Sequence, residues 1–268
     1  MRRTFEFHAQ AVAVAAQVSG PNSIEGVWAS VSLPIIGGKD TRSVGRFRHE
    51  PVLSFESATA TVEGRTNGSV HSTRAEIRVT GLNVLDKVRG DVHLIMTTNY
   101  DAAARQYQVE FGPERPLARL TVPGVNTALV TYNGRRYPSL AAPSSGPAAP
   151  VPVASQAGVM RCPVDFHPIM DHIRTSAPTK HRLHPHNAVL TSLVDPETAF
   201  QWDTAQNRFG FVSVPGLGRV YFLEWAIEPY RQSLTALRIV LDDPEHRYKG
   251  EIVIADPEEN GRPEGRGW

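Results

Sequence analysis

The sequence predicts an all-β protein, either an antiparallel β-sandwich or paired sheets, with few short helices. Apolar and polar residues alternate in residues 74–80 and again in residues 91–97, on either side of a turn-rich step at 81–86. Two such runs with a short connection are typical of neighbouring antiparallel strands that bury one face. Asn67 and Gly68 form a dipeptide that favours a tight hairpin turn, and they lead directly into the first run.

Further strands follow from the same alternation and from the turn residues between runs. In chain order we expect strands at residues 5–13, 27–33, 52–62, 74–80, 91–97, 109–111, 118–122, 128–132, 188–194, 209–214, 218–227, 233–241 and 251–255. Residues 100–108 predict either one helical turn capped by Asp101 or a long hairpin tip. Residues 165–174 predict one short helix, because Ile169 and Ile173 fall on one face.

A proline-rich, uncharged segment divides the chain into two halves. We expect residues 138–157 to be an extended linker or surface strap, because such a composition forms neither a helix nor a central strand. Residues 1–137 and 158–255 are then two β subdomains or two sheets of one domain. Residues 256–268 form a polar tail, which we expect to be disordered unless an assembly holds it.

Composition restricts the class of protein. The 268 residues carry a formal net charge of +1, so no global field attracts nucleic acid. Cys162 is the single cysteine, so no intramolecular disulfide is expected. No apolar stretch reaches the length of about 20 residues that a membrane-spanning helix needs. Polar residues interrupt the N-terminal apolar run, which favours a first strand over a cleaved leader and leaves the localisation unassigned.

Three segments resemble a group of uncharacterised bacterial β-rich proteins. They are GLNVLD at residues 81–86 with Asp91 downstream, VPGLGRVYFLEW at residues 214–225, and LTALRIVL at residues 234–241. That group is similar to the exported surface proteins described as having a choice of cell-surface anchors. The resemblance implies a β-rich, surface-associated module without assigned chemistry, and it supplies no functional residues.

Three histidines form the most suggestive ligand pattern. His181, His184 and His186 are spaced H-x-x-H-x-H, and Cys162 lies upstream. Histidine and thiolate are good zinc ligands. However, this spacing matches no standard zinc motif, and the flanking lysine and arginine favour an ordinary solvated loop. A metal site is therefore the alternative here. Nucleotide binding is not expected, because the sequence contains no P-loop, and no cofactor is predicted.

Glu224 is the candidate carboxylate of a hydrolase, because it interrupts an otherwise apolar strand. Glu228 is four residues further on, about 13 Å away along a strand, which is too far for the paired carboxylates of a glycosidase. A second acid would have to come from another strand. The simpler expectation is that Glu224 faces solvent or pairs with an arginine across the sheet.

Tyr221 and Trp225 flank that carboxylate and suggest a sugar-binding surface. Exposed aromatic rings on one face of a sandwich would stack on a glycan, although most such rings belong to the core. The leading hypothesis is therefore non-catalytic: a structural or interaction protein that binds itself or another protein through sheet edges. A carbohydrate-binding module and a hydrolase using Glu224 or the histidine loop are the alternatives.

Overall fold

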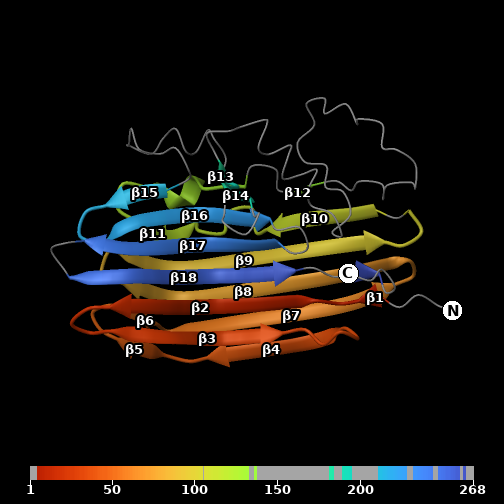
Figure 1. Ribbon diagram of the computed structural model, residues 1–268, viewed down its shortest axis with the longest axis horizontal. Coiled ribbons are helices and arrows are strands. Elements are labelled where there is room, and N and C mark those ends of the chain that lie inside the picture. Colours follow the sequence, from red (N-terminus) through yellow and green to blue (C-terminus); the bar gives the residue numbers. More distant parts are fainter. Residues whose placement is uncertain are drawn as a thin grey trace.

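Two antiparallel sheets pack face to face in the computed structural model, which confirms the expected all-β sandwich (Figure 1). The structure describes residues 5–104, 106–132, 136–137, 181–183, 189–194, 211–227, 232–243, 247–259 and 262–263. Within these residues the only helix is a short 3-10 turn, η1 (Thr127–Leu129). No helix in the described part is long and apolar enough to cross a membrane.

The first sheet, called here the β8 sheet, comes entirely from the first half of the chain. Its main strands, in spatial order, are β4 (Gly38–Val44), β7 (Ser57–Asn67), β8 (Val70–Val84), β9 (Val88–Asp101), β10 (Gln106–Gly112) and β12 (Arg136–Tyr137). Shorter strands complete it: β5 (Phe47–His49) pairs with β6 (Leu53–Phe55), β6 with the end of β8, and β11 (Arg119–Thr121) with the start of β9. The hairpin predicted at Asn67 and Gly68 joins β7 to β8 and is confirmed.

The second sheet, the β17 sheet, combines both ends of the chain. Its strands, in spatial order, are β13 (His181–Leu183), β14 (Val189–Ser192), β16 (Gly218–Ile227), β17 (Gln232–Asp243), β18 (Tyr248–Glu259), β2 (Ala9–Ser19) and β3 (Ile24–Ser32). β15 (Phe211–Val214) also pairs with β16. β1 (Phe5–Glu6) and β19 (Arg262–Pro263) form a separate two-stranded sheet. Because β2 pairs with β18, the segments 1–137 and 158–255 contribute to one sheet.

The core lies between the two sheets, where β2 and β18 pack on β8. On β8 the residues Ala75, Ile77 and Val79 are fully buried, and their polar neighbours face outward, as the alternation predicts. Val14 and Ile254 are fully buried opposite them. Burial of apolar surface by both sheets is therefore the main stabilising contribution.

One line of residues across the β17 sheet breaks the alternation on five strands at once. We call it the crease; it consists of Leu223, Ala236, Ala255, Ala13 and Ala29, on β16, β17, β18, β2 and β3. At the crease two consecutive side chains point into the core, as Ala13 and Val14 do on β2. Leu223, Ala255 and Ala29 have left-handed backbones, with φ of 46°, 56° and 53°. A non-glycine residue in this conformation costs about 1–2 kcal/mol.

Several expected elements differ from the structure. The strand expected at 52–62 is divided into β6 and β7, and residues 128–132 contain part of η1 instead of a strand. At 100–108, β9 and β10 pair as a hairpin, and in its connection the Asp101 carboxylate accepts hydrogen bonds from the backbone of Ala103 and Ala104. The polar tail is predicted to begin at residue 256, which is too early, because β18 continues to Glu259. The strap at 138–157 and the helix at 165–174 both lie entirely outside the described residues.

Candidate functional site

Glu224 is paired with an arginine across the sheet, which confirms the simpler expectation for this carboxylate. Arg238 on β17 donates to it from Nε, at 2.5 Å, and from Nη2, at 2.8 Å. Glu224 is 5% exposed, and a second carboxylate, Glu251, lies 3.7 Å from Arg238 Nε. Such a bidentate, charge-assisted pair fixes the orientation of both side chains. Glu224 is thus engaged by Arg238 and does not line an open cleft as a free acid.

Tyr221 and Trp225 are buried, so they lack the exposed rings that the alternative of a sugar-binding surface requires. Arg238 covers the ring of Tyr221, with its guanidinium carbon 3.9 Å from the ring centroid. Trp225 points into the core, because the crease at Leu223 reverses the facing of the residues that follow. Its Nε1 donates to Oε1 of Gln232 at 3.2 Å. Neither ring offers a face to a sugar.

The predicted histidine loop stays a prediction. His181 begins β13, and His184 and His186 lie outside the described residues. Within the part of the chain that is described, no group of three or more His, Cys, Asp or Glu side chains has the arrangement of a metal site.

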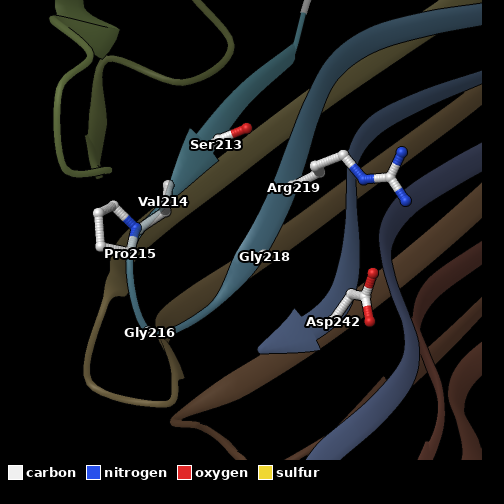
Figure 2. A pocket seen from close by; sticks show the side chains of 7 residues that line it. All are labelled: Ser213, Val214, Pro215, Gly216, Gly218, Arg219 and Asp242. Carbon is white, nitrogen blue, oxygen red and sulfur yellow. The ribbon is translucent and has the colours of Figure 1, made fainter. Parts of the chain in front are cut away.

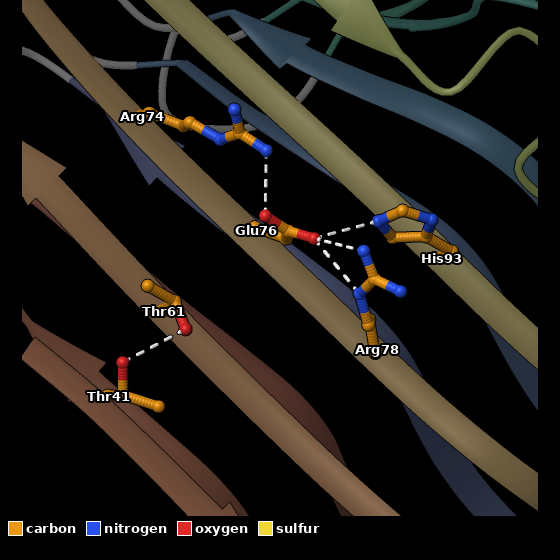
Figure 3. Close-up of polar contacts among 6 residues, drawn as sticks. All are labelled: Thr41, Thr61, Arg74, Glu76, Arg78 and His93. Atoms are coloured by element: carbon orange, nitrogen blue, oxygen red, sulfur yellow. Dashed lines mark hydrogen bonds and ion pairs between the residues drawn. The ribbon is translucent and has the colours of Figure 1, made fainter.

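A charged cluster lies on the outer face of the β8 sheet (Figure 3). The Glu76 carboxylate accepts hydrogen bonds from Arg74 and Arg78 of its own strand and from His93 of β9, at 2.7–3.0 Å. Burial alone would raise the pKa of Glu76, but these three hydrogen bonds outweigh it and lower the pKa to about 2. Burial also lowers the pKa of His93 more than the bond to Glu76 raises it. At pH 7 the cluster thus holds an ionised Glu76 carboxylate beside a neutral His93 imidazole.

Hydroxyl pairs link the strands beside that cluster. Thr41 bonds Thr61 at 3.1 Å, Ser43 bonds Thr59 at 3.1 Å, and Ser57 bonds Thr80 at 2.7 Å (the first pair is drawn in Figure 3). Cross-strand hydroxyl pairs of this kind stabilise an exposed sheet face. Their donors and acceptors are used by one another, so we assign them to the stability of the sheet.

A shallow hollow of about 340 Å³ lies beside the β15–β16 turn (Figure 2). It is lined by Ser213, Val214, Pro215, Gly216, Gly218, Arg219 and Asp242. Arg219 and Asp242 come from neighbouring strands and point to the same side, yet among the described residues no ion pair joins them. Its volume is at the lower end of the range for small-molecule pockets. With Asp242 exposed, it does not enclose a ligand.

A buried chain of hydrogen bonds crosses between the sheets at the end of the sandwich. Trp225 donates to Gln232, Gln232 donates from Nε2 to Thr98 Oγ1 at 3.2 Å, and Thr98 donates to Oε2 of Glu259. Glu259 is completely buried, and its Oε1 has no hydrogen-bond partner. Burial raises the pKa of this carboxyl well above its ordinary value, which favours the protonated acid. All four side chains of this chain are buried.

Two sheet edges lie on the same side of the sandwich, at β3 and β4, and they differ in protection (Figure 1). Among the described strands β3 pairs only with β2, and β4 only with β7. β4 carries Lys39, Asp40 and Arg42, the kind of charges that prevent strand addition. β3 carries one charged residue, Glu25, and an apolar side chain, Val27, that is 59% exposed. The β3 edge is therefore the less protected of the two.

The described residues define a β-sandwich protein in which the β3 edge carries fewer charges than the β4 edge. A domain of unknown function, DUF8256, matches this chain over residues 5–111. The match runs from β1 into β10 and so includes both β3 and β4, but it covers less than half of the chain. No curated protein and no solved structure matches.

Sequence reasoning identified Glu224 and its type of partner but missed the edge at β3. Position in a sheet depends on which distant strands pair, and only the structure shows that β3 comes last. One signal was present: residues 26–29 contain no charge, whereas the seven residues of β4 contain three.

Proposed function

We propose that the protein is a non-catalytic interaction protein whose β3 edge binds a second copy of the chain by strand addition. The exposure of Val27 on an edge strand that carries a single charged residue, Glu25, supports this proposal. An edge strand presents unpaired backbone N–H and C=O groups, which an added strand satisfies while its side chains cover the apolar ones. The free β4 edge is a built-in contrast, because its three charges disfavour the same event.

The other candidate functions have less support. A hydrolase needs an acid that is free to transfer a proton, whereas Glu224 is held by Arg238. A carbohydrate-binding module needs accessible rings, and the two candidates are buried. Attachment to a cell surface, which the sequence resemblance implies, is compatible with edge pairing and is part of the proposal.

Sedimentation velocity over a concentration series tests the proposal. We expect a reversible monomer–dimer equilibrium for the natural sequence, and the Val27→Lys variant should remain monomeric because a lysine at the edge opposes pairing. Thr121→Lys on the exposed strand β11 is the matched control, since it adds the same charge elsewhere and should leave the dimer intact. A monomer at all concentrations up to about 1 mM, which corresponds to a binding free energy weaker than about −4 kcal/mol, would reject self-association.

A further inference from the structure

The free hydrogen-bonding groups of β3 belong to the residues whose side chains face outward. Leu33, just after β3, has a buried side chain, and its N–H donates to the carbonyl of Ala9 at 2.8 Å. In a strand of L-residues the side-chain face and the direction of the backbone N–H and C=O alternate together. Residues of β3 with inward side chains therefore bond to β2. Glu25 and Val27 face outward, so they direct their backbone groups toward the free edge.

The crease limits the length of that edge. Ala29 has a left-handed backbone with φ of 53°, and the alternation reverses between Trp28 and Ala29. Residues 24–28 pair in regular register with residues 18–14 of β2. A regular added strand can therefore extend along residues 24–28 only, and Gly26 is the centre of this segment.

We infer that two copies pair antiparallel through residues 24–28 about a two-fold axis at Gly26. This register rests on the proposed self-association and specifies its geometry. Glu25 of each copy then lies opposite Val27 of the other, and each of these pairs exchanges two backbone hydrogen bonds. An axis at Val27 would instead place Glu25 opposite the left-handed Ala29, whose backbone groups do not continue the ladder. The axis at Gly26 thus satisfies more of the free edge.

The side chains of residues 24–28 allow two copies to pair about the two-fold axis at Gly26. A Cβ on Gly26 would lie 2.9 Å from the Trp28 ring, so the ring covers this glycine from its own strand. On the axis the two glycines form a non-hydrogen-bonded pair, the position where chains approach most closely. On the outer face Val27 contacts the aliphatic part of Glu25 of the other copy. The two Glu25 carboxylates lie diagonally and avoid direct like-charge opposition.

A segment of this length gives a small interface, below about 1,200 Å², the range of weak and transient complexes. A covalent trap is therefore the suitable test. In a Cys162→Ser background we would make Glu25→Cys and Val27→Cys separately and oxidise each protein alone and the two mixed. Directly opposite hydrogen-bonded residues have Cα atoms about 5.5 Å apart, within the range for a disulfide.

We expect the mixture to form disulfide-linked dimers at least about five-fold more than either variant alone, since only opposite positions meet the distance requirement. Ser30→Cys, exposed on the same strand beyond the crease, is the control for random collision. It should not increase the yield of disulfide-linked dimer. Circular dichroism of each variant before oxidation checks that it is folded.

The possible failures are distinguishable. Efficient cross-linking of Val27→Cys alone would place the axis at Val27 and overturn the register while keeping the β3 interface. No cross-linking in the mixture, together with a dimer that Val27→Lys abolishes, would also overturn this register alone. A protein that is monomeric at every concentration would overturn both the register and the proposed function.

Discussion

Thr98 on β9 donates a hydrogen bond to the buried carboxyl of Glu259 on β18, so the two sheets are joined by a polar contact inside an apolar core. The donor and the acceptor are 161 residues apart in the chain. Buried polar groups are tolerated where hydrogen bonds satisfy them, and here one oxygen of the carboxyl lacks a partner. Ionisation of Glu259 would leave an uncompensated charge between the sheets.

Replacement of this carboxyl should remove a pH dependence of stability. The pKa of Glu259 is raised in the folded protein, so its contribution is fully present below about pH 4.5, the ordinary value, and is lost as pH rises toward the folded value. Between the ordinary pKa and the folded pKa, the free energy of unfolding falls by about 1.4 kcal/mol per pH unit. Glu259→Gln should be more stable than the natural sequence at pH 8, by urea unfolding. Glu50→Gln, at an exposed site outside β3, is the control; equal slopes in all three proteins would contradict this account.

Arg238→Met should destabilise the protein strongly, because it leaves the Glu224 carboxylate buried without its partner. Removing one member of a buried ion pair typically costs about 3–5 kcal/mol. The double variant Glu224→Gln/Arg238→Met should recover more than half of that loss, since no charge is then left unpaired. Chemical unfolding of the single and double variants measures the coupling. Simple additivity of the two changes would show that the pair is not coupled.

Glu76 should make the protein sensitive to acid. Its pKa is lowered to about 2 in the folded state, so its stabilising contribution is present above the ordinary value near 4.5 and is lost as pH falls toward 2. The group is partly exposed, so we expect an effect below about 1 kcal/mol. Thermal unfolding at pH 6 and pH 3 should show a smaller fall in midpoint for Glu76→Gln than for the natural sequence. An identical fall would place the acid sensitivity elsewhere.

Gly250→Ala should be destabilising by more than about 2 kcal/mol, because strain and a steric clash coincide at this position. The backbone φ of Gly250 is +140°, and an added Cβ would lie 2.0 Å from the carbonyl oxygen of Gln17 on the adjacent β2. Gly45→Ala is the matched control, since a Cβ there meets nothing within 4 Å. Similar unfolding midpoints for the two variants would refute the close approach of β2 and β18 at Gly250.

Local patterns were sufficient to predict much of the fold. The alternation around Ile77 and Leu94, and the turn at Asn67 and Gly68, are properties of short segments, and they predicted β8, β9 and a hairpin correctly. The pairing of β2 with β18 could not be predicted, because it joins segments more than 200 residues apart and depends on how both sheets close. For the same reason, the edge position of β3 could not be predicted from the sequence.

The candidate site was less predictable than the fold, because it depends on which face of the sheet each side chain occupies. A strict two-residue period starting from Phe222 would place Trp225 on the outer face. The left-handed Leu223 changes the period, and the ring lies in the core instead. The expectation that Glu224 pairs with an arginine was correct because a charged residue in an apolar strand needs a nearby partner, whichever strand provides it.

The crease has a consequence for how the β17 sheet finds its alignment during folding. In an ordinary sheet a strand that slips by two residues keeps every side chain on its correct face, so such errors are only weakly penalised. Here a slip of β2 by two residues would move Ala13 out of line with Ala255 and Ala29, and part of the strand would then face the wrong way. The crease therefore favours a single alignment of the five strands.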